Sequence, residues 1–97
     1  MASYILLASY TEQGIKGIKD TVKRTSAVKE MAKKAGVEMK ESYWTLGQFD
    51  VVALFEAPDD ATMTAFSLSV AKLGNVKTQT LRAFSGKEMT DILSKLT

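Results

Sequence analysis

The chain has 97 residues, of which 45% are hydrophobic and 25% charged, and its 13 basic and 11 acidic side chains leave a formal net charge of +2. This length predicts a single domain, residues 1–97, because two separate cores would each be too small to be stable. The absence of histidine and cysteine excludes disulfides, thiolate metal sites and catalysis by Ser-His-Asp or Cys-His groups.

The sequence shows no sign of a targeting segment. Its first residues, MASY, lead directly into a short apolar segment without the basic region or cleavage site of a signal peptide. No apolar run approaches the roughly 20 residues that cross a bilayer. The near balance of charges and the lack of a recognised binding motif speak against nucleic acid. We therefore expect a cytoplasmic protein without membrane or nucleic-acid partners.

The first half of the chain predicts a strand, a helix and a second strand. Residues 4–10 are apolar on both faces, which is typical of a central strand, and residues 11–14 break it. An amphipathic helix follows, capped by Asp20 and ended by Gly36. Residues 37–46 mix charged and apolar side chains, as an edge strand does. The apolar positions of the helix are Ile18, Val22, Val28, Met31, Ala32 and Ala35.

The second half predicts a hairpin, two further strands and two helices. Gly47-Gln48-Phe49 reverses the chain, because glycine tolerates the positive φ of such a turn. Residues 50–57 are an apolar and therefore central strand, which Pro58 ends. A helix over residues 61–73 and a polar edge strand over residues 76–84 follow. Ser85 and Glu88 then form a capping box that opens a short C-terminal helix.

The order of these elements predicts an α+β fold. It is the ferredoxin-like βαββαβ arrangement with one extra C-terminal helix. The two apolar strands must be central, so the four-stranded antiparallel sheet has the order 4-1-3-2. Helices cover one face of this sheet, while the other face still carries apolar side chains. We therefore expect a homodimer that buries the uncovered sheet face.

The second helix is unusually poor in charge. Between residues 61 and 74 the sole charged side chain is Lys72, whereas a surface helix usually carries a charged stripe. We assign its core side to Met63, Phe66, Val70 and Leu73. We assign its outer side to Thr62, Thr64, Ser67, Ser69 and Ala71. The outer side is expected to be covered by the C-terminal helix folding back or by a neighbouring subunit of a higher homo-oligomer; the alternative is an uncharged, solvated face.

Four segments resemble the GYD domain family: residues 10–14 (YTEQG), 43–50 (YWTLGQFD), 56–60 (EAPDD) and 73–84 (LGNVKTQTLRAF). The namesake Gly-Tyr-Asp is changed, because Gly47-Gln48-Phe49-Asp50 is one residue longer and has phenylalanine for tyrosine. The resemblance implies a fold of the dimeric α/β-barrel type and supplies no reaction. The hairpin is also similar to the Gly-x-x-Asp turn in the effector-binding domains of leucine-responsive regulators.

Asp50 and the aromatic residues are the first candidates for a binding site. Asp50 could grip the amine or hydroxyl of a ligand, or it could accept backbone N–H groups across its own hairpin. Tyr10 and Trp44 could line an apolar ligand cavity together with Tyr4, Tyr43 and Phe55, or all five could be ordinary packing. Because Tyr43 and Trp44 alternate on a strand, they point to opposite faces of the sheet.

The polar residues of the last strand are the second group of candidates. Thr78, Thr80 and Arg82 share one face of it. Arg82 then needs a counter-charge, which is either Glu56 across the sheet or the anionic group of a ligand.

Two clusters of charge have a structural and a functional interpretation. Glu56, Asp59 and Asp60 could hold Mg²⁺ or Ca²⁺, but their position just before a helix favours capping, so we expect no metal and no cofactor. The basic first helix could attract phosphate or an acidic partner, although a solvated face is favoured. Its basic residues are Lys16, Lys19, Lys23, Arg24, Lys29, Lys33 and Lys34.

Two functions fit these features. The first is a dimeric small-molecule binding or sensing module without catalytic machinery. The second is a cofactor-independent enzyme, a monooxygenase or isomerase, acting on an apolar or aromatic substrate. In either case the ligand-binding candidates are Tyr10, Trp44, Gly47, Phe49, Asp50, Glu56, Thr78, Thr80 and Arg82.

Overall fold

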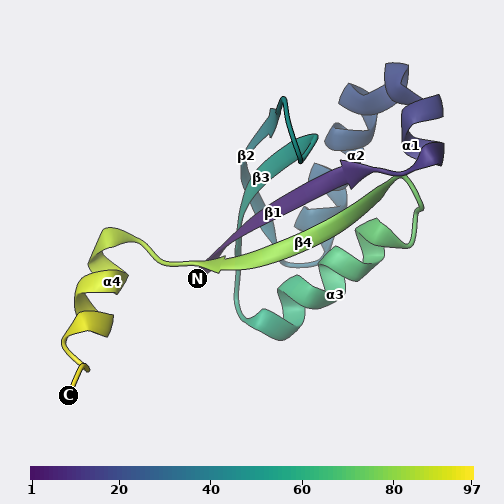
Figure 1. Ribbon diagram of the computed structural model, residues 1–97. Helices are drawn as coiled ribbons and strands as arrows, with labels where there is room; N and C mark the ends of the chain where they lie inside the picture. The colour runs from purple at the N-terminus through teal and green to yellow at the C-terminus, as the bar shows by residue number, and fades with distance from the viewer.

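A computed structural model describes all residues, 1–97, and its centre is one four-stranded antiparallel sheet (Figure 1). The strand order is β2-β3-β1-β4, which is the predicted order 4-1-3-2 counted from the other edge. The apolar strands β1 and β3 are central, as their composition predicted. The strands are β1 (Ala2–Tyr10), β2 (Glu38–Trp44), β3 (Val51–Ala57) and β4 (Val76–Ala83).

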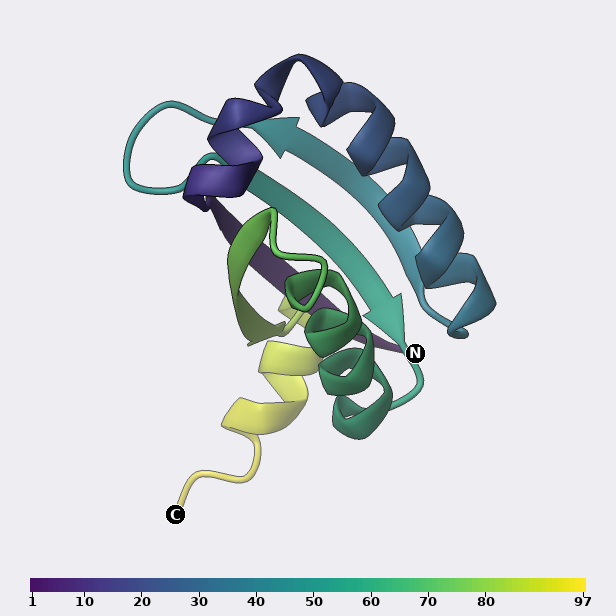
Figure 2. The ribbon, with the colours of Figure 1, turned by 90° about the vertical axis from the view of Figure 1, so that its right-hand side faces the viewer.

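The two longer helices pack on the same side of the sheet (Figure 2). None of the helices is both long and apolar enough to span a membrane. The order of strands and helices confirms the ferredoxin-like α+β fold. The helices are α1 (Glu12–Lys16), η1 (Ile18–Asp20), α2 (Thr21–Lys34), α3 (Asp60–Ala71) and α4 (Gly86–Leu93).

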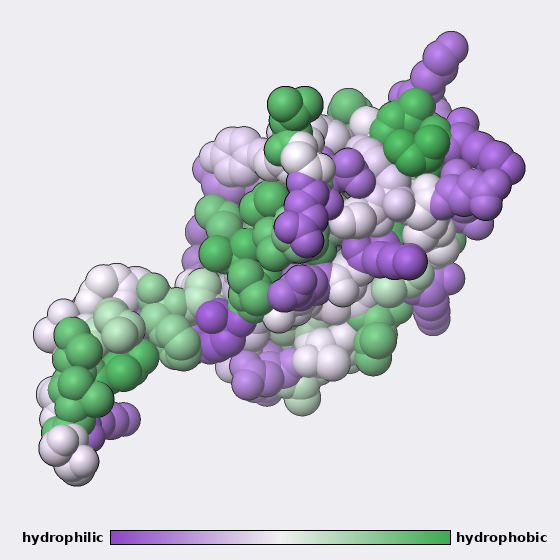
Figure 3. All heavy atoms as spheres, viewed as in Figure 1, coloured by the Kyte–Doolittle hydropathy of each residue, from purple (hydrophilic) through white to green (hydrophobic).

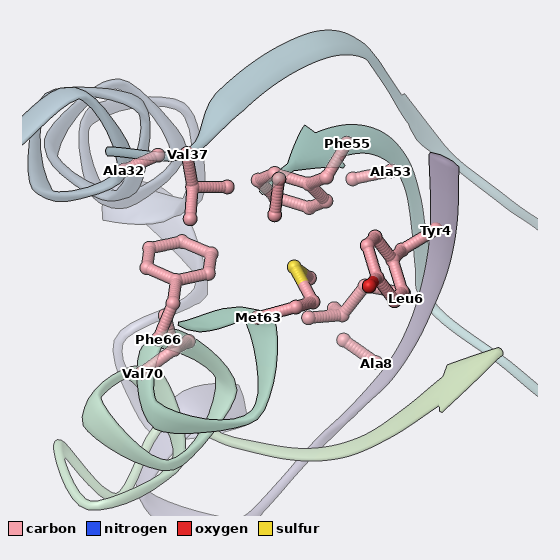
Figure 4. Close-up of a cluster of buried hydrophobic side chains, with 11 residues drawn as sticks. Tyr4, Leu6, Ala8, Ala32, Val37, Ala53, Phe55, Met63, Phe66 and Val70 are labelled. Atoms are coloured by element: carbon pink, nitrogen blue, oxygen red, sulfur yellow. The ribbon is translucent and has the colours of Figure 1, made fainter. Parts of the chain in front are cut away.

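The hydrophobic core lies between the sheet and α3. Figure 4 shows Met63 and Phe66 reaching from α3 toward Phe55 on β3, and these are the largest fully buried side chains. The rings of Phe55 and Phe66 have their centroids 5.3 Å apart. Val37, at the turn after α2, is also buried here. The core therefore fixes α3 firmly, while α2 joins it mainly through Ala32.

The segment after β1 differs from the expected break. Thr11 caps the short helix α1 by accepting a hydrogen bond from the Gly14 amide, and the Thr11 amide donates to the Asn75 carbonyl over 3.0 Å. A Cβ atom on Gly14 would lie 2.0 Å from the Asn75 oxygen. Only glycine permits this contact, so α1 packs directly on the loop before β4. Asp20 precedes α2, but its side chain forms no capping hydrogen bond.

The register gives the sheet two distinct faces. Tyr4 is opposite Phe55 on β3 and Arg82 on β4, so these three side chains point toward the helices. The residues that precede and follow them along each strand point away from the helices. We call this surface the open face, because no helix of the chain covers it. Figure 3 shows apolar side chains gathered over the strands in this region. The apolar residues of the open face are Ile5, Leu7, Val52, Leu54 and Leu81.

Helix α4 stands clear of the rest of the molecule (Figure 1). The predicted capping box of Ser85 and Glu88 is confirmed. The helix does not fold back over α3, so that part of the prediction for α3 is wrong. Large apolar side chains along this C-terminal segment are exposed: Phe84, Met89, Leu93 and Leu96.

The two sides of α3 also differ in part from the prediction. Ser67 is buried, because the inward positions follow the i, i+3, i+4, i+7 spacing of a helix face. Its hydroxyl lies 2.9 Å from the Thr80 hydroxyl on β4. Leu73 follows the end of the helix and is half exposed, whereas Leu68 takes the outer side with 65% of its surface exposed.

Candidate functional site

An apolar cavity lies between α2 and the helix-covered face of the sheet. Its volume is about 140 Å³, and 13 of its 18 lining residues are hydrophobic. An apolar cavity of about 150 Å³ accommodates benzene, so this space fits a single ring. Five of its lining residues also belong to the core drawn in Figure 4: Leu6, Ala8, Ala53, Phe55 and Val70.

Small side chains on both walls explain why the cavity exists. Ala8 on β1 and Ala53 on β3 line it from the sheet, and Ala27 lines it from α2. Leu6 is opposite Ala53, and Ala8 is opposite Val51, so each large side chain on the two central strands has a small neighbour there. The three methyl groups leave room that a leucine at any of these positions would fill.

The polar part of the lining consists of Tyr10, Thr21, Arg24 and their neighbours, which are half-buried. The Tyr10 hydroxyl lies 2.7 Å from Thr21 Oγ1. The Trp44 indole donates to the same Thr21 oxygen over 3.0 Å. Arg24 donates from Nη2 to the Gly14 carbonyl over 3.0 Å, and its Cζ lies 5.9 Å from the centroid of the Tyr10 ring. These contacts place a fixed cation at the edge of an apolar space.

A second, more polar hollow of about 330 Å³ adjoins the cavity between α2 and β2. The two spaces share three lining residues, Thr25, Met39 and Ser42. We call this second hollow the groove. The further residues of the groove are Val22, Ser26, Lys29, Lys40, Glu41 and Trp44.

The structure brings Tyr10 and Trp44 to these spaces, and Phe55, which was grouped with them, also lines the cavity. Tyr10 lines the cavity and Trp44 lines the groove. Trp44 points to the helix side and Tyr43 is opposite Val52 on the open face, as the alternation predicted.

Asp50 does not line either space, but it supports one residue that does. Its Oδ2 accepts a hydrogen bond from the Tyr10 amide over 2.8 Å, and its own amide donates to the Ala8 carbonyl over 2.9 Å. The expectation that the Asp50 carboxylate bridges its own hairpin is therefore wrong. The carboxylate ties the hairpin to the last residue of β1, where β1 and β3 lie side by side. It thus holds the strand end that carries Tyr10.

Gly47 and Phe49 lie in the hairpin, away from the cavity. Gly47 has a φ of 119°, which favours glycine and confirms a turn at this position. The Phe49 carbonyl accepts from the Thr45 hydroxyl over 2.6 Å. The structure gives both residues a role in the turn.

Thr78, Thr80 and Arg82 share the helix-covered face of β4, as predicted, but they do not line the cavity. Arg82 pairs with Glu88 of α4 over 3.4 Å and lies over the Phe84 ring, 4.6 Å from its centroid. Of the two alternatives for the partner of Arg82, the pair with Glu56 is wrong.

The opposite faces of the sheet explain the error. Glu56 is opposite Ser3, whereas Arg82 is opposite the adjacent residue Tyr4, so the two charges lie on different sides. Glu56 is instead 3.6 Å from Lys40. Lys40 is the unpaired residue of β2 at the irregularity between Met39 and Glu41, and β2 lies beside β3, the strand that carries Glu56.

The carboxylates around the start of α3 act on the backbone and on Tyr4. Asp59 caps the helix by accepting the Thr62 amide over 2.8 Å, and this hydrogen bond lowers the pKa of Asp59. The Tyr4 hydroxyl donates to Asp60 over 2.6 Å, which raises the pKa of Tyr4. Capping is thus confirmed for Asp59. No three His, Cys, Asp or Glu side chains meet in a geometry that could hold a metal ion.

Arg24 is the residue at the cavity that reasoning from the sequence missed. It was counted among the basic residues of a solvated helix face. A signal was present, because Arg24 follows Thr21 by three positions and precedes Val28 by four, and both neighbours line the cavity. Arginine among lysines is informative too, since its planar guanidinium suits bidentate recognition of anions.

The chain is similar to known proteins both in sequence and in structure. A protein of Thermus thermophilus, named glutamine synthetase and cystathionine beta-lyase binding protein, is 32% identical over 97 residues, 99% of each chain. The crystal structure of TTHA0845 from the same organism matches with a TM-score of 0.59 and 23% identity, covering 89% of this chain and 96% of that one.

A second similar structure is that of an enzyme with a bound ring compound. The 5-chloro-2-hydroxyhydroquinone dehydrochlorinase of Burkholderia phenoliruptrix, in complex with 2,5-dihydroxybenzoquinone, matches with a TM-score of 0.61 and 18% identity over 90% of this chain and 97% of that one. Identities at this level show the fold alone. The GYD domain itself matches residues 4–93. The chain therefore belongs to the GYD domain family.

Proposed function

We propose that the protein is a small-molecule binding and sensing module whose ligand occupies the cavity under α2. The observation that carries this proposal is the cavity itself, a ring-sized apolar space with a few polar groups at one side. Such spaces are unusual in close-packed interiors and are typical of ligand sites.

The lining favours binding over catalysis. Tyr10 and Arg24 are the only titratable residues among the 18 that line the cavity. Arginine stays protonated and is a poor proton acceptor, and the Tyr10 hydroxyl is already hydrogen-bonded to Thr21. A cofactor-independent enzyme would have to use Tyr10 or the ligand's own groups for proton transfer. We therefore place the enzyme second, and turnover of a bound ring compound would reverse that order.

Filling the cavity tests the binding proposal. In Ala53→Leu the new side chain occupies the space between β3 and α2, whereas the control Ala65→Leu adds the same atoms to an exposed position on α3. Titration with toluene and indole, followed by NMR, should shift cavity resonances in the unmodified protein and in the control. Ala53→Leu should abolish the shifts. Equal shifts in Ala53→Leu, or none in any variant, would refute the cavity as a ligand site.

A second candidate function is docking on a metabolic enzyme. The relative that is 32% identical over 99% of both chains is named as a binding protein for glutamine synthetase and cystathionine beta-lyase. The outer side of α3 is a suitable surface, because it carries the exposed Leu68 and no charged side chain from Ala61 to Ala71. In this view, ligand binding in the cavity changes the surface that α3 presents to the enzyme, because Val70 of α3 lines the cavity.

Co-elution experiments test docking directly. The chain is mixed with purified glutamine synthetase or cystathionine beta-lyase of its own organism and passed over a sizing column. Co-elution that Leu68→Glu abolishes would support docking through α3, and Lys33→Glu on α2 is the matched surface control. Separate elution of the unmodified chain from both enzymes would exclude these partners. If Leu68→Glu without any enzyme elutes at a smaller size than the unmodified chain, the outer side of α3 is instead a contact within a higher homo-oligomer.

The open face supports a homodimer as the working unit. Leu54 on β3 and Leu81 on β4 belong to this face and remain more than one-third exposed in the single chain. A second copy offers an identical apolar surface, and sheet-to-sheet packing buries both. The exposed apolar side of α4 is a further surface that the second copy can cover. The dimer leaves the cavity untouched, since the cavity lies on the opposite side of the sheet.

A further inference from the structure

We infer that the ligand of the cavity is a small aromatic carboxylate, with its ring among the apolar side chains and its carboxylate on Arg24. This inference rests on the proposed role of the cavity as a ligand site and adds the chemical class of the ligand. It starts from the one full charge in the cavity lining.

Arg24 has donors left over and no counter-charge in the chain. It takes part in none of the four ion pairs. Its one hydrogen bond, from Nη2 to the Gly14 carbonyl, uses one of the five N–H donors of a guanidinium. A half-buried cation beside an apolar space loses solvation, and an anion that pairs with it restores the lost interaction.

The guanidinium is also held in position before any ligand arrives. It lies over the Tyr10 ring and against the backbone of α1. A Cβ atom on Gly17 would come within 3.1 Å of Arg24 Nη1, so a side chain there would push the guanidinium away. A preorganised arginine loses little rotamer freedom on binding, which favours a bidentate contact with a planar carboxylate.

Apart from Arg24, the polar side chains of the cavity lining are uncharged, and those of Tyr10, Thr21 and Thr25 are already hydrogen-bonded. The Thr21 hydroxyl meets both Tyr10 and Trp44, and the Thr25 hydroxyl donates to the Thr21 carbonyl over 3.0 Å. These groups are therefore satisfied within the chain. A phosphate has more oxygens than Arg24 alone can serve, and the lysines of α2 are absent from the cavity lining. A carboxylate on a ring matches one arginine and one ring-sized space.

The test compares a charged ring compound with neutral ones of the same size. Dissociation constants for benzoate, benzyl alcohol and toluene are measured by NMR titration for the unmodified protein, Arg24→Gln and the control Lys29→Gln. Lys29 is the matched cation of α2 that lines the outer groove but not the cavity. Arg24→Lys keeps the charge without the planar fork, and thermal unfolding of each variant verifies that it is folded.

The unmodified protein and Lys29→Gln should bind benzoate roughly tenfold or more tightly than benzyl alcohol, as a charge-assisted hydrogen-bonded pair implies. Arg24→Gln should lose that preference and keep its affinity for toluene, and Arg24→Lys should keep part of it. Equal affinities for benzoate and benzyl alcohol, or a preference for benzoate that persists in Arg24→Gln, would refute the proposed contact between a ligand carboxylate and Arg24. The proposal that the cavity binds a ring compound would still stand. If none of the three compounds binds any folded variant, the proposed function falls with it.

Discussion

Asp50 shows how one carboxylate can organise a site without touching a ligand. Its hydrogen bond from the Tyr10 amide joins the hairpin to the end of β1. In Asp50→Ala this amide loses its partner in a half-buried place, so we expect a loss of roughly 1–2 kcal/mol in the free energy of unfolding. Urea unfolding measures this loss, and faster hydrogen exchange at the Tyr10 amide should accompany it. Gln48→Ala, in the same hairpin, is the control, and equal stability of the two variants would contradict this role.

Gly14 is the most restricted of the glycines. Alanine there would place its Cβ 2.0 Å from the Asn75 carbonyl oxygen, and α1 would have to move off the loop before β4. Overpacking of this kind costs on the order of 1–3 kcal/mol, which thermal unfolding should show as a clearly lower midpoint. Gly86→Ala, in the first turn of α4 with no atom within 4 Å of the new methyl group, should change the midpoint little. A Gly14→Ala variant as stable as Gly86→Ala would refute the close contact.

Local sequence rules predicted which kind of interaction several residues make, but not the residues far away in sequence with which they make it. Aspartate after a glycine-containing turn predicted a hydrogen bond to backbone, and that bond exists. Its donor, Tyr10, lies 40 positions away in sequence and could be found only through the pairing of β1 with β3. The cavity was equally invisible, because it depends on three alanines of different elements facing one another.

At the scale of elements, two carboxylates cap helices and make stability depend on pH. The Thr62 amide lowers the pKa of Asp59, and the Ser85 amide, with a smaller contribution from Arg82, lowers the pKa of Glu88. A folded-state pKa below the unfolded value means that the contribution is complete above the unfolded value, near pH 4, and is lost as pH falls through the folded value.

Asp59→Asn tests this pH dependence for α3. Asparagine also caps helices but does not titrate, so the variant should show a flatter decline in thermal midpoint between pH 5 and roughly pH 2 than the unmodified protein. Asp91→Asn is the control, because the Asp91 carboxylate accepts no side-chain or capping hydrogen bond and only its carbonyl is used. If the thermal midpoints of all three proteins fall equally steeply as the pH is lowered, the Asp59 cap adds no pH dependence.

The sequence predicted the long elements well and the short ones poorly. Apolar patterns located β1, β3, α2 and α3, because burial of such segments dominates local preferences, whereas the mixed and polar composition of β2 and β4 predicted edge strands. Residues 11–14 were expected to be a break, and no separate element was predicted between them and the helix that begins near Asp20. Residues 12–20 instead form α1 and η1, because tertiary contacts with Asn75 and Arg24 hold this segment. The C-terminal helix was found through its capping box, but its direction away from α3 has no local signal.

At the scale of the whole molecule, the open face and α4 predict self-association. Leu54→Lys places a charge in the middle of the open face and should shift the proposed dimer to a monomer. Leu68→Lys makes the same change on the outer side of α3 and should leave the dimer intact. Light scattering on a sizing column at micromolar concentration measures both. A monomeric unmodified protein, or a dimer that Leu54→Lys does not weaken, would exclude the sheet-to-sheet arrangement.

The central position of β1 has a consequence for synthesis on the ribosome. β1 is made first, yet its two neighbours are β3 and β4, and Ser3 finally pairs with Ala83 near the other end of the chain. At about 5–20 residues per second, this apolar strand waits several seconds before either partner has been made. During that time it resembles an exposed, aggregation-prone edge. Slower synthesis lengthens the time for which β1 is unpaired. The yield of folded protein should therefore depend on chaperones that bind nascent chains at the ribosome, although the chain is small.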